Sequence, residues 1–326
     1  MKQNPTIERP ASRIMWLAVS ALSINAVYDK PAYADGVAIH QCVIVSKSLD
    51  TIFLTGPDAD LFSLNLATGR TQWSSTEGVV PLGVMNGELL VQGQPAKAGT
   101  LELISLSASE GQAVDRHSVS LPSSVHAAPL PGPGRAFAMS ASPGAGGFRL
   151  QWNAMTSPLA ARGAAGQEAE GNGKLSNGAV DVRMGKAKFS AAASSSLAKT
   201  PAAPMLSEVN DIKLGGTDGR KFISADGKHL LVSERRKNAL PVEAYRWSIY
   251  DMESEKLLGQ ATSPISVSPF VVSGSTLIYT TPEMSFRSGA EVLGYPSSVR
   301  ARDLNTGSEV WSHEIPSLVL KGPFPH

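Results

Sequence analysis

The chain has 326 residues, and 29 Lys and Arg against 28 Asp and Glu give it a formal net charge of +1. Without a basic stripe, this balance argues against nucleic acid as a partner, because phosphate binding needs clustered Lys and Arg. The single cysteine, Cys42, excludes an intramolecular disulfide and a zinc site built on cysteine pairs. It lies in the apolar run 42–45, which favours a buried small side chain over a reactive thiol.

Residues 1–34 have the pattern of a signal peptide. Basic Lys2, Arg9 and Arg13 precede the apolar stretch 14–27, and Ala32 and Ala34 supply small residues where a signal peptidase cuts. We expect cleavage before Asp35, with the mature chain 35–326 periplasmic or secreted and without a transmembrane span. The alternatives are an uncleaved anchor and a buried helix.

From residue 40 onward the sequence predicts many short antiparallel strands, because short alternating apolar runs are separated by Gly, Pro, Asn and Asp. An Asn-Gly turn at 86–87 and an Asp-Gly turn at 226–227 predict tight hairpins. The expected strands are 51–55, 61–66, 71–74, 79–84, 88–92, 101–106, 112–120, 135–140, 148–152, 221–224, 229–233, 245–250, 256–260, 269–272, 276–280, 299–303 and 309–315.

Residues 65–73 and 303–311 share the pattern Asp/Asn-x-x-Thr-Gly-x-x-x-Trp, and weaker copies begin at Ser107, Asn153 and Asp251. We interpret the motif as structural: the first residue closes a turn, the Gly takes a positive φ, and the Trp packs between neighbouring sheets. The structural repeat residues so predicted are Asn65, Thr68, Gly69, Trp73, Asp251, Asp303, Thr306, Gly307 and Trp311.

Most copies of the motif follow one another at roughly 40 to 50 residues, the length of a four-stranded propeller blade. The step from Asn153 to Asp251 is about twice that length, so we expect a degenerate blade between 164 and 216, with 180–184 and 186–190 as its hairpin. The sequence therefore predicts an all-β propeller of six blades, with seven as the alternative. Strand 40–45 is expected to close the ring beside the last blade. Long flexible loops are expected near 160–178 and 190–208, where the composition is rich in Gly, Ala, Ser and Pro.

The repeated motif resembles the repeats of the quinoprotein-like (PQQ-like) β-propeller family, and residues 222–230 resemble the first hairpin of YVTN and WD40-like propellers. The complete motif with Trp stands at Trp73 and Trp311, while the copies at Ser107 and Asp251 lack both Thr and Trp. The enzymes of this family hold their quinone against a vicinal Cys-Cys disulfide, which a chain with one cysteine cannot form. The resemblance thus implies the fold and does not imply the cofactor.

No catalytic, cofactor-binding or metal-binding constellation emerges from the sequence. The histidines are scattered, and Asp58-Ala59-Asp60 is better explained as a turn than as a calcium loop. Ser196-Leu197-Ala198-Lys199 matches a Ser-x-x-Lys pattern without its partner motifs. The charged run 234–237 is interpreted as a solvated loop rather than a docking patch.

These observations favour an exported, non-catalytic, monomeric propeller scaffold that binds a protein or cell-envelope partner. The irregular region between Asn153 and Asp251 is where we expect that partner to bind. The alternative is a cofactor-free accessory subunit of a periplasmic oxidoreductase, similar to that of amine dehydrogenases, or a quinoprotein-like enzyme. Whether the protein is an enzyme stays open, with a non-enzymatic role favoured.

Overall fold

The computed structural model describes residues 35–130, 135–144, 146–156, 174–184, 190–194, 208–209, 212, 214, 219–288 and 291–317. These residues are nearly all β: they form strands and one short 3-10 helix, η1 (Pro241–Glu243). The predicted leader 1–34, the Ser196–Lys199 pattern and the last residues, 318–326, lie outside the described residues.

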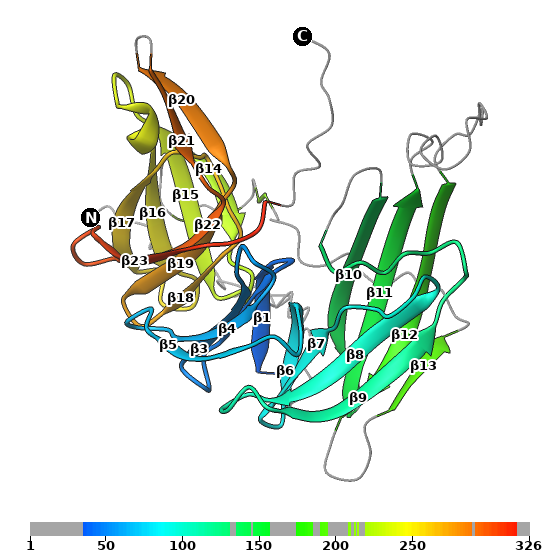
Figure 1. The fold of residues 1–326 in the computed structure, drawn as a ribbon. Helices are drawn as coiled ribbons and strands as arrows, with labels where there is room; N and C mark the ends of the chain where they lie inside the picture. Colours follow the sequence, from blue (N-terminus) through cyan, green and yellow to red (C-terminus); the bar gives the residue numbers. More distant parts are fainter. Residues whose placement is uncertain are drawn as a thin grey trace, which may run out of the picture. The chain divides into compact units, whose positions relative to one another are not determined.

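The described strands form five antiparallel sheets of four or five strands, here called sheets I to V, and one two-stranded hairpin (Figure 1). Sheet I contains β1 (Gly36–His40), β2 (Val43–Ser46), β3 (Thr51–Thr55), β4 (Leu61–Asn65) and β5 (Thr71–Ser75). Sheet II contains β6 (Val80–Met85), β7 (Glu88–Gln92), β8 (Thr100–Ser107) and β9 (Ala113–Ser120). Sheet III contains β10 (Arg135–Gly144), β11 (Gly147–Thr156), β12 (Lys174–Arg183) and β13 (Ser190–Ser194).

Sheet IV contains β14 (Arg220–Ile223), β15 (His229–Arg235), β16 (Tyr245–Asp251) and β17 (Leu257–Ser263). Sheet V contains β18 (Phe270–Ser273), β19 (Thr276–Thr281), β22 (Ser298–Asp303) and β23 (Glu309–Glu314). A separate hairpin, β20 (Met284–Ser288) and β21 (Glu291–Tyr295), is inserted between β19 and β22. In every sheet the strands follow one another in chain order, so the predicted all-β meanders of sheets I, II, IV and V are confirmed.

The interpretation of the third repeat and of the degenerate blade is wrong. Asn153 does not begin a turn, because β11 continues to Thr156 and pairs along its length with both β10 and β12. The first half of the predicted hairpin 180–184 and 186–190 lies almost wholly in β12 of sheet III, which pairs with β11 and β13, and residues 186–189 lie outside the described residues. Strands β11 and β12 are separated by residues 157–173 in the chain. The local pattern of apolar residues cannot predict that two such distant strands pair. Strands β12 and β13 also occupy parts of the two ranges expected to be loops, 160–178 and 190–208.

The expected closing strand 40–45 is also corrected. It is interrupted by a turn, so that β1 ends at His40 and β2 begins at Val43. Both strands pair within sheet I, and β1 lies beside β19 of sheet V. The segment therefore does adjoin the last sheet, as one end of a hairpin in the first sheet.

The turn between the last two strands of sheets I, II, IV and V, here called the outer turn, has one geometry throughout. It begins at Asn65, Ser107, Asp251 or Asp303, and the amide of that residue donates to the carbonyl five residues later. A register shift follows in each adjoining strand pair. The fourth residue after the first has positive φ in all four turns, which is the arrangement of a type I turn followed by a G1 bulge.

Four apolar clusters join the sheets in series. One cluster joins sheet IV to sheet V and a second joins V to I. A third cluster joins sheet I to II, and the fourth joins II to III. The core is therefore made between sheet faces, by the buried alternate residues of each strand.

Each sheet ends in four strands in chain order, and the connection between the second and third of these lies at the end opposite to the other two connections. We call this the loop end, and it carries 56–60, 93–99, 236–244 and 282–297 in sheets I, II, IV and V. The opposite turn end carries the outer turns and short connections such as 86–87 and 274–275. The corresponding loop-end segment of sheet III, 157–173, lies outside the described residues.

Candidate functional site

In the outer turns of sheets I, IV and V, the side chain of the first residue accepts hydrogen bonds from amides that follow it. Asn65 Oδ1 accepts from the Thr68 amide at 3.0 Å and from its hydroxyl at 2.9 Å. Asp251 Oδ1 accepts from the Ser254 hydroxyl and amide, both at 2.7 Å, and these bonds lower the pKa of Asp251. The side chains are thus engaged in closing turns.

The last outer turn repeats the arrangement. Asp303 Oδ1 accepts from the amides of Asn305 at 2.6 Å and Thr306 at 3.4 Å. Gly307 has a φ of +71° and donates its amide to the Asp303 carbonyl at 2.7 Å. The sequence motif and the turn geometry therefore coincide at both ends of the chain.

The two motif tryptophans join adjacent sheets by the same contact. Trp73 Nε1 of sheet I donates to the carbonyl of Ala108 in the outer turn of sheet II at 3.0 Å. Trp311 Nε1 of sheet V donates to the carbonyl of Leu66 in the outer turn of sheet I, also at 3.0 Å. Each acceptor directly follows the first residue of its turn, so the tryptophans bind equivalent atoms.

Both rings also lie against the positive-φ glycine of the turn that they contact. A Cβ on Gly69 would lie 2.4 Å from Trp311 Cγ, and one on Gly111 would lie 2.5 Å from Trp73 Cε3. Between sheets IV and V, Gly259 takes the tryptophan's position, and a Cβ there would lie 2.0 Å from the Leu304 carbonyl oxygen. At this interface the backbone of Gly259 lies directly against the backbone of Leu304, where the other two interfaces have a tryptophan ring.

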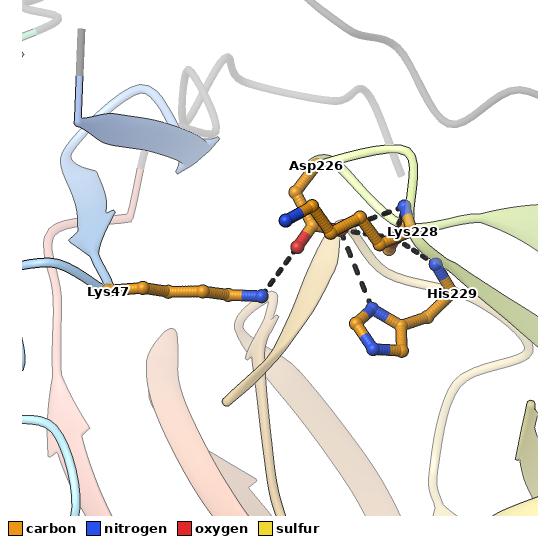
Figure 2. Close-up of polar contacts among 5 residues, drawn as sticks. Lys47, Asp226, Lys228 and His229 are labelled. Carbon is orange, nitrogen blue, oxygen red and sulfur yellow. Dashed lines mark hydrogen bonds and ion pairs between the residues drawn. The ribbon is translucent and has the colours of Figure 1, made fainter. Parts of the chain in front are cut away.

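A buried charged cluster connects the β2–β3 turn of sheet I with the β14–β15 turn of sheet IV. Figure 2 shows the Lys47 side chain reaching Asp226 from one side and the His229 ring lying on the other. Lys47 Nζ lies 2.6 Å from Asp226 Oδ2, and the Ser224 hydroxyl donates to Oδ1 at 2.5 Å. His229 Nδ1 is 3.6 Å from Oδ1, and the Asp226 side chain is 4% exposed.

Burial opposes ionisation of Asp226, but contacts from His229, Lys47 and Ser224 outweigh it and hold the pKa of this carboxyl well below its usual range. The carboxylate is therefore a fixed anion that ties two turns together. The sequence pattern at 225–228 predicts only a turn and gives no sign of this cluster. Lys47 lies 179 residues away, and no local pattern connects it to Asp226.

The half-buried His40 and the buried Cys42 are both uncharged at neutral pH. Burial lowers the pKa of His40 to about 4, and its Nδ1 accepts the Cys42 amide at 3.3 Å. Burial raises the pKa of the Cys42 thiol to about 11, and this residue is 1% exposed. The prediction of a buried small side chain at Cys42 is confirmed.

The remaining candidates from the sequence are also placed. The Asp58–Asp60 segment forms a turn in which the Gly56 amide donates to the Asp60 carbonyl at 2.7 Å. In the charged run, Glu234 pairs with Arg246 and Arg236 with Glu243, at exposed positions. Across the described ranges, no three His, Cys, Asp or Glu side chains are grouped as metal ligands would be.

The most elaborate described surface lies at the loop end of sheets IV and V. Leu240, just before η1, is 68% exposed. The β20–β21 hairpin is held by a Phe286–Tyr295 edge contact, with ring centroids 5.6 Å apart, and pairs with no strand of the described sheets. These features make the 236–244 loop and this hairpin the candidate interaction surface.

The fold and these contacts define an all-β protein of repeated antiparallel sheets that pack face to face. At two of the interfaces, a tryptophan of one sheet binds the outer turn of the next. No family model matches the sequence, and no curated protein matches it. In the described part of the chain, no helix has the length and apolar character needed to cross a membrane.

Among solved structures, the chain matches the β-propeller domain of Cps50 (Swd1) from Myceliophteria thermophila, at 10% identity and a TM-score of 0.24, covering 87% of this chain and 90% of that one. A europium-containing methanol dehydrogenase has 12% identity and a TM-score of 0.22, with 87% and 71% covered. Hydrazine synthase of Kuenenia stuttgartiensis has 12% identity and a TM-score of 0.24, with 87% and 67% covered.

Proposed function

We propose that the mature chain is an exported, non-catalytic β-propeller scaffold, and that it binds a protein or cell-envelope partner through the loop end of sheets IV and V. Export is supported by the leader pattern of residues 1–34. The propeller is supported by the repeated four-stranded meanders and by the serial packing of their faces.

The observation that carries the binding proposal is the difference between the two ends of the sheets. At the turn end, connections are as short as 86–87 and 274–275, and the side chains of the outer turns bind their own backbone. At the loop end, the connections 236–244 and 282–297 are long and contain η1 and β20–β21. Binding residues concentrate on loops that a rigid scaffold positions.

The chemistry of these loops suits a protein partner. Leu240 presents an exposed apolar side chain, and Arg235 and Lys237 beside it are exposed cations. A two-stranded hairpin alone is only marginally stable in water, so an added strand or a covering surface would stabilise β20–β21. An apolar anchor with a polar rim is the usual organisation of a protein interface.

Site-specific photocrosslinking in the native cell envelope tests this proposal. A photoreactive residue at Leu240 should give a discrete crosslinked species that mass spectrometry can identify. The matched control is Leu257, a second exposed leucine of sheet IV that lies on its outer strand. Equal crosslinking from both positions, or none from Leu240, contradicts the loop-end interface.

The ultraviolet–visible spectrum of the purified exported protein tests the non-catalytic part separately. We expect a spectrum of aromatic residues alone. A quinone or haem band would overturn the scaffold proposal in favour of an oxidoreductase or a quinoprotein-like enzyme.

A further inference from the structure

Two of the sheet interfaces can be compared residue by residue. Trp73 and Trp311 stand eight residues after the first residues of their outer turns, and they pair with Ser63 and Ala301 in equivalent registers. Two residues further on, Ser75 pairs with Leu61, and His313 pairs with Val299. Ser75 and His313 therefore occupy the same position in their sheets.

At the interface between sheets V and I, His313 fills this position. Its Nε2 lies 2.8 Å from the carbonyl oxygen of Gly69, and its ring centroid is 5.8 Å from that of Trp311. The imidazole of His313 thus lies beside Trp311 and contacts the carbonyl of Gly69, the glycine with positive φ.

At the interface between sheets I and II, the small Ser75 leaves this position open. A groove of about 520 Å³ lies there, lined by Ser75 and by residues of the neighbouring turn that include Glu110, Gly111 and Gln112. Gly111 is the counterpart of Gly69, and Trp73 packs against it as Trp311 packs against Gly69. Gly111 thus lines the groove with Trp73 packed against it, and Ser75 leaves unfilled the space that His313 fills in the equivalent interface.

The groove is acidic. Asp60, Glu77 and Glu110 line it. Glu77 forms an ion pair with Arg116 of β9, whereas Asp60 and Glu110 have no ion pair among the described residues. Two carboxylates thus face a space next to β5, which pairs with β4 alone in the described sheets and so has an open outer edge.

We propose that this groove binds an arginine side chain of an extended, basic peptide segment. The guanidinium takes the place that the His313 ring has in the equivalent interface, donates an N–H to the Gly111 carbonyl and balances the charges of Asp60 and Glu110. Arginine suits the site because its planar group carries several donors and remains protonated. The peptide backbone lies along the open edge of β5. The site is separate from the proposed loop-end interface and does not depend on it.

Isothermal titration calorimetry of the purified chain with two capped peptides tests the site. The first is acetyl-Ala-Ser-Arg-Ser-Ala-amide, and the second has citrulline, which is neutral and of similar shape, in place of arginine. We expect saturable binding of the arginine peptide that weakens as salt is raised, since exposed charges are screened. Equal affinity for the citrulline peptide, or no binding of either peptide, overturns the proposal.

Variants locate the site. Ser75→His should abolish binding, because it places in the groove the ring that His313 places in the equivalent interface. Glu110→Gln should weaken binding about threefold, as loss of one exposed charge does. Glu253→Gln, an exposed carboxylate in the outer turn of sheet IV, is the matched control and should change nothing.

Each variant's thermal unfolding midpoint shows whether its fold is retained. Should Ser75→His fail to fold, Glu110→Gln and Asp60→Asn carry the test, because they change exposed or half-exposed side chains without adding volume. Wild-type affinity in both carboxylate variants, or in a folded Ser75→His variant, places the peptide elsewhere and contradicts the inference.

Discussion

Trp311 and Leu66, 245 residues apart in the chain, are joined by a hydrogen bond of 3.0 Å from the indole N–H to the backbone carbonyl. The bond connects the outer strand of sheet V to the outer turn of sheet I. Because Trp73 makes the same contact with Ala108, one local motif supplies the connection between sheets twice.

Replacing Trp311 with phenylalanine should destabilise the protein by about 1–3 kcal/mol, because the Leu66 carbonyl loses its donor inside a buried interface. Trp73→Phe should cost less, since Trp73 is only half-buried. Urea unfolding at neutral pH measures both free energies. Equal stability of wild type and Trp311→Phe would show that the indole N–H contributes nothing.

Gly69→Ala should destabilise the protein more than Gly87→Ala does. Both glycines have positive φ, at +66° and +79°, so both variants incur a conformational cost of about 1–2 kcal/mol. Only the Gly69 variant adds a clash with Trp311, which overpacking data place at about 1–3 kcal/mol more. A Cβ on Gly87 meets no atom within 4 Å, so the difference between the two unfolding free energies isolates the tryptophan contact.

Glu255→Gly should stabilise the protein slightly. Glu255 occupies the position of Gly69, Gly111 and Gly307 with a φ of +59°, which disfavours a residue with a Cβ by about 1–2 kcal/mol. Greater freedom of glycine in the unfolded chain offsets about 0.4–1 kcal/mol of that gain. A thermal midpoint that rises in Glu255→Gly and falls in Gly307→Glu would establish the equivalence of these turns, and a fall in the first would refute it.

The Asp226 cluster predicts a loss of stability in acid. The pKa of Asp226 is lower in the folded chain than its unfolded value near 3.8, so the folded state binds fewer protons. Its stabilising contribution is therefore complete above the unfolded pKa and declines as pH falls below about 4 toward the folded pKa. Unfolding free energies of wild type and Asp226→Asn, measured from pH 7 to pH 2.5, should differ most at pH 7 and converge in acid.

Lys47→Met provides an independent measurement on the same cluster. It leaves a buried carboxylate without its ammonium partner, which costs about 3–5 kcal/mol when a pair is fully buried. Lys47 is partly exposed, so a smaller loss is expected. The double variant Lys47→Met/Asp226→Asn should be more stable than Lys47→Met alone, and additivity of the two single effects would show that the groups do not interact.

Cys42 should resist thiol reagents in the native protein. Its thiol is buried and has a pKa raised to about 11, so it is neither accessible nor ionised at pH 8. A colorimetric disulfide reagent should react with it only after denaturation. Stoichiometric reaction of the native protein within seconds would contradict the burial.

The local part of this structure follows from the sequence because its interactions are local. The Asn-Gly turn at 86–87 requires positive φ, and the first residues of the outer turns bind amides two or three residues ahead. The strands of sheets I, II, IV and V are bounded by such turns. Their inner strands, such as β2, β3 and β6, are buried at every position, and alternate residues of β2 and β3 pack into two different apolar clusters. The order of most of these strands could therefore be predicted before any packing was known, whereas β1 and β2 were expected as one strand and the β20–β21 hairpin was not predicted.

The tertiary structure decided what depends on distant partners. Pairing of β11 with β12 crosses the segment 157–173, and Lys47 meets Asp226 only when sheets I and IV are folded. Only the strand registers show that His313 and Ser75 occupy equivalent positions beside a tryptophan, so that the groove at Ser75 corresponds to the space filled by His313. Hydrogen bonding within a turn is specified by a few neighbouring residues, whereas burial, ion pairs and grooves arise from surfaces that the chain brings together on folding.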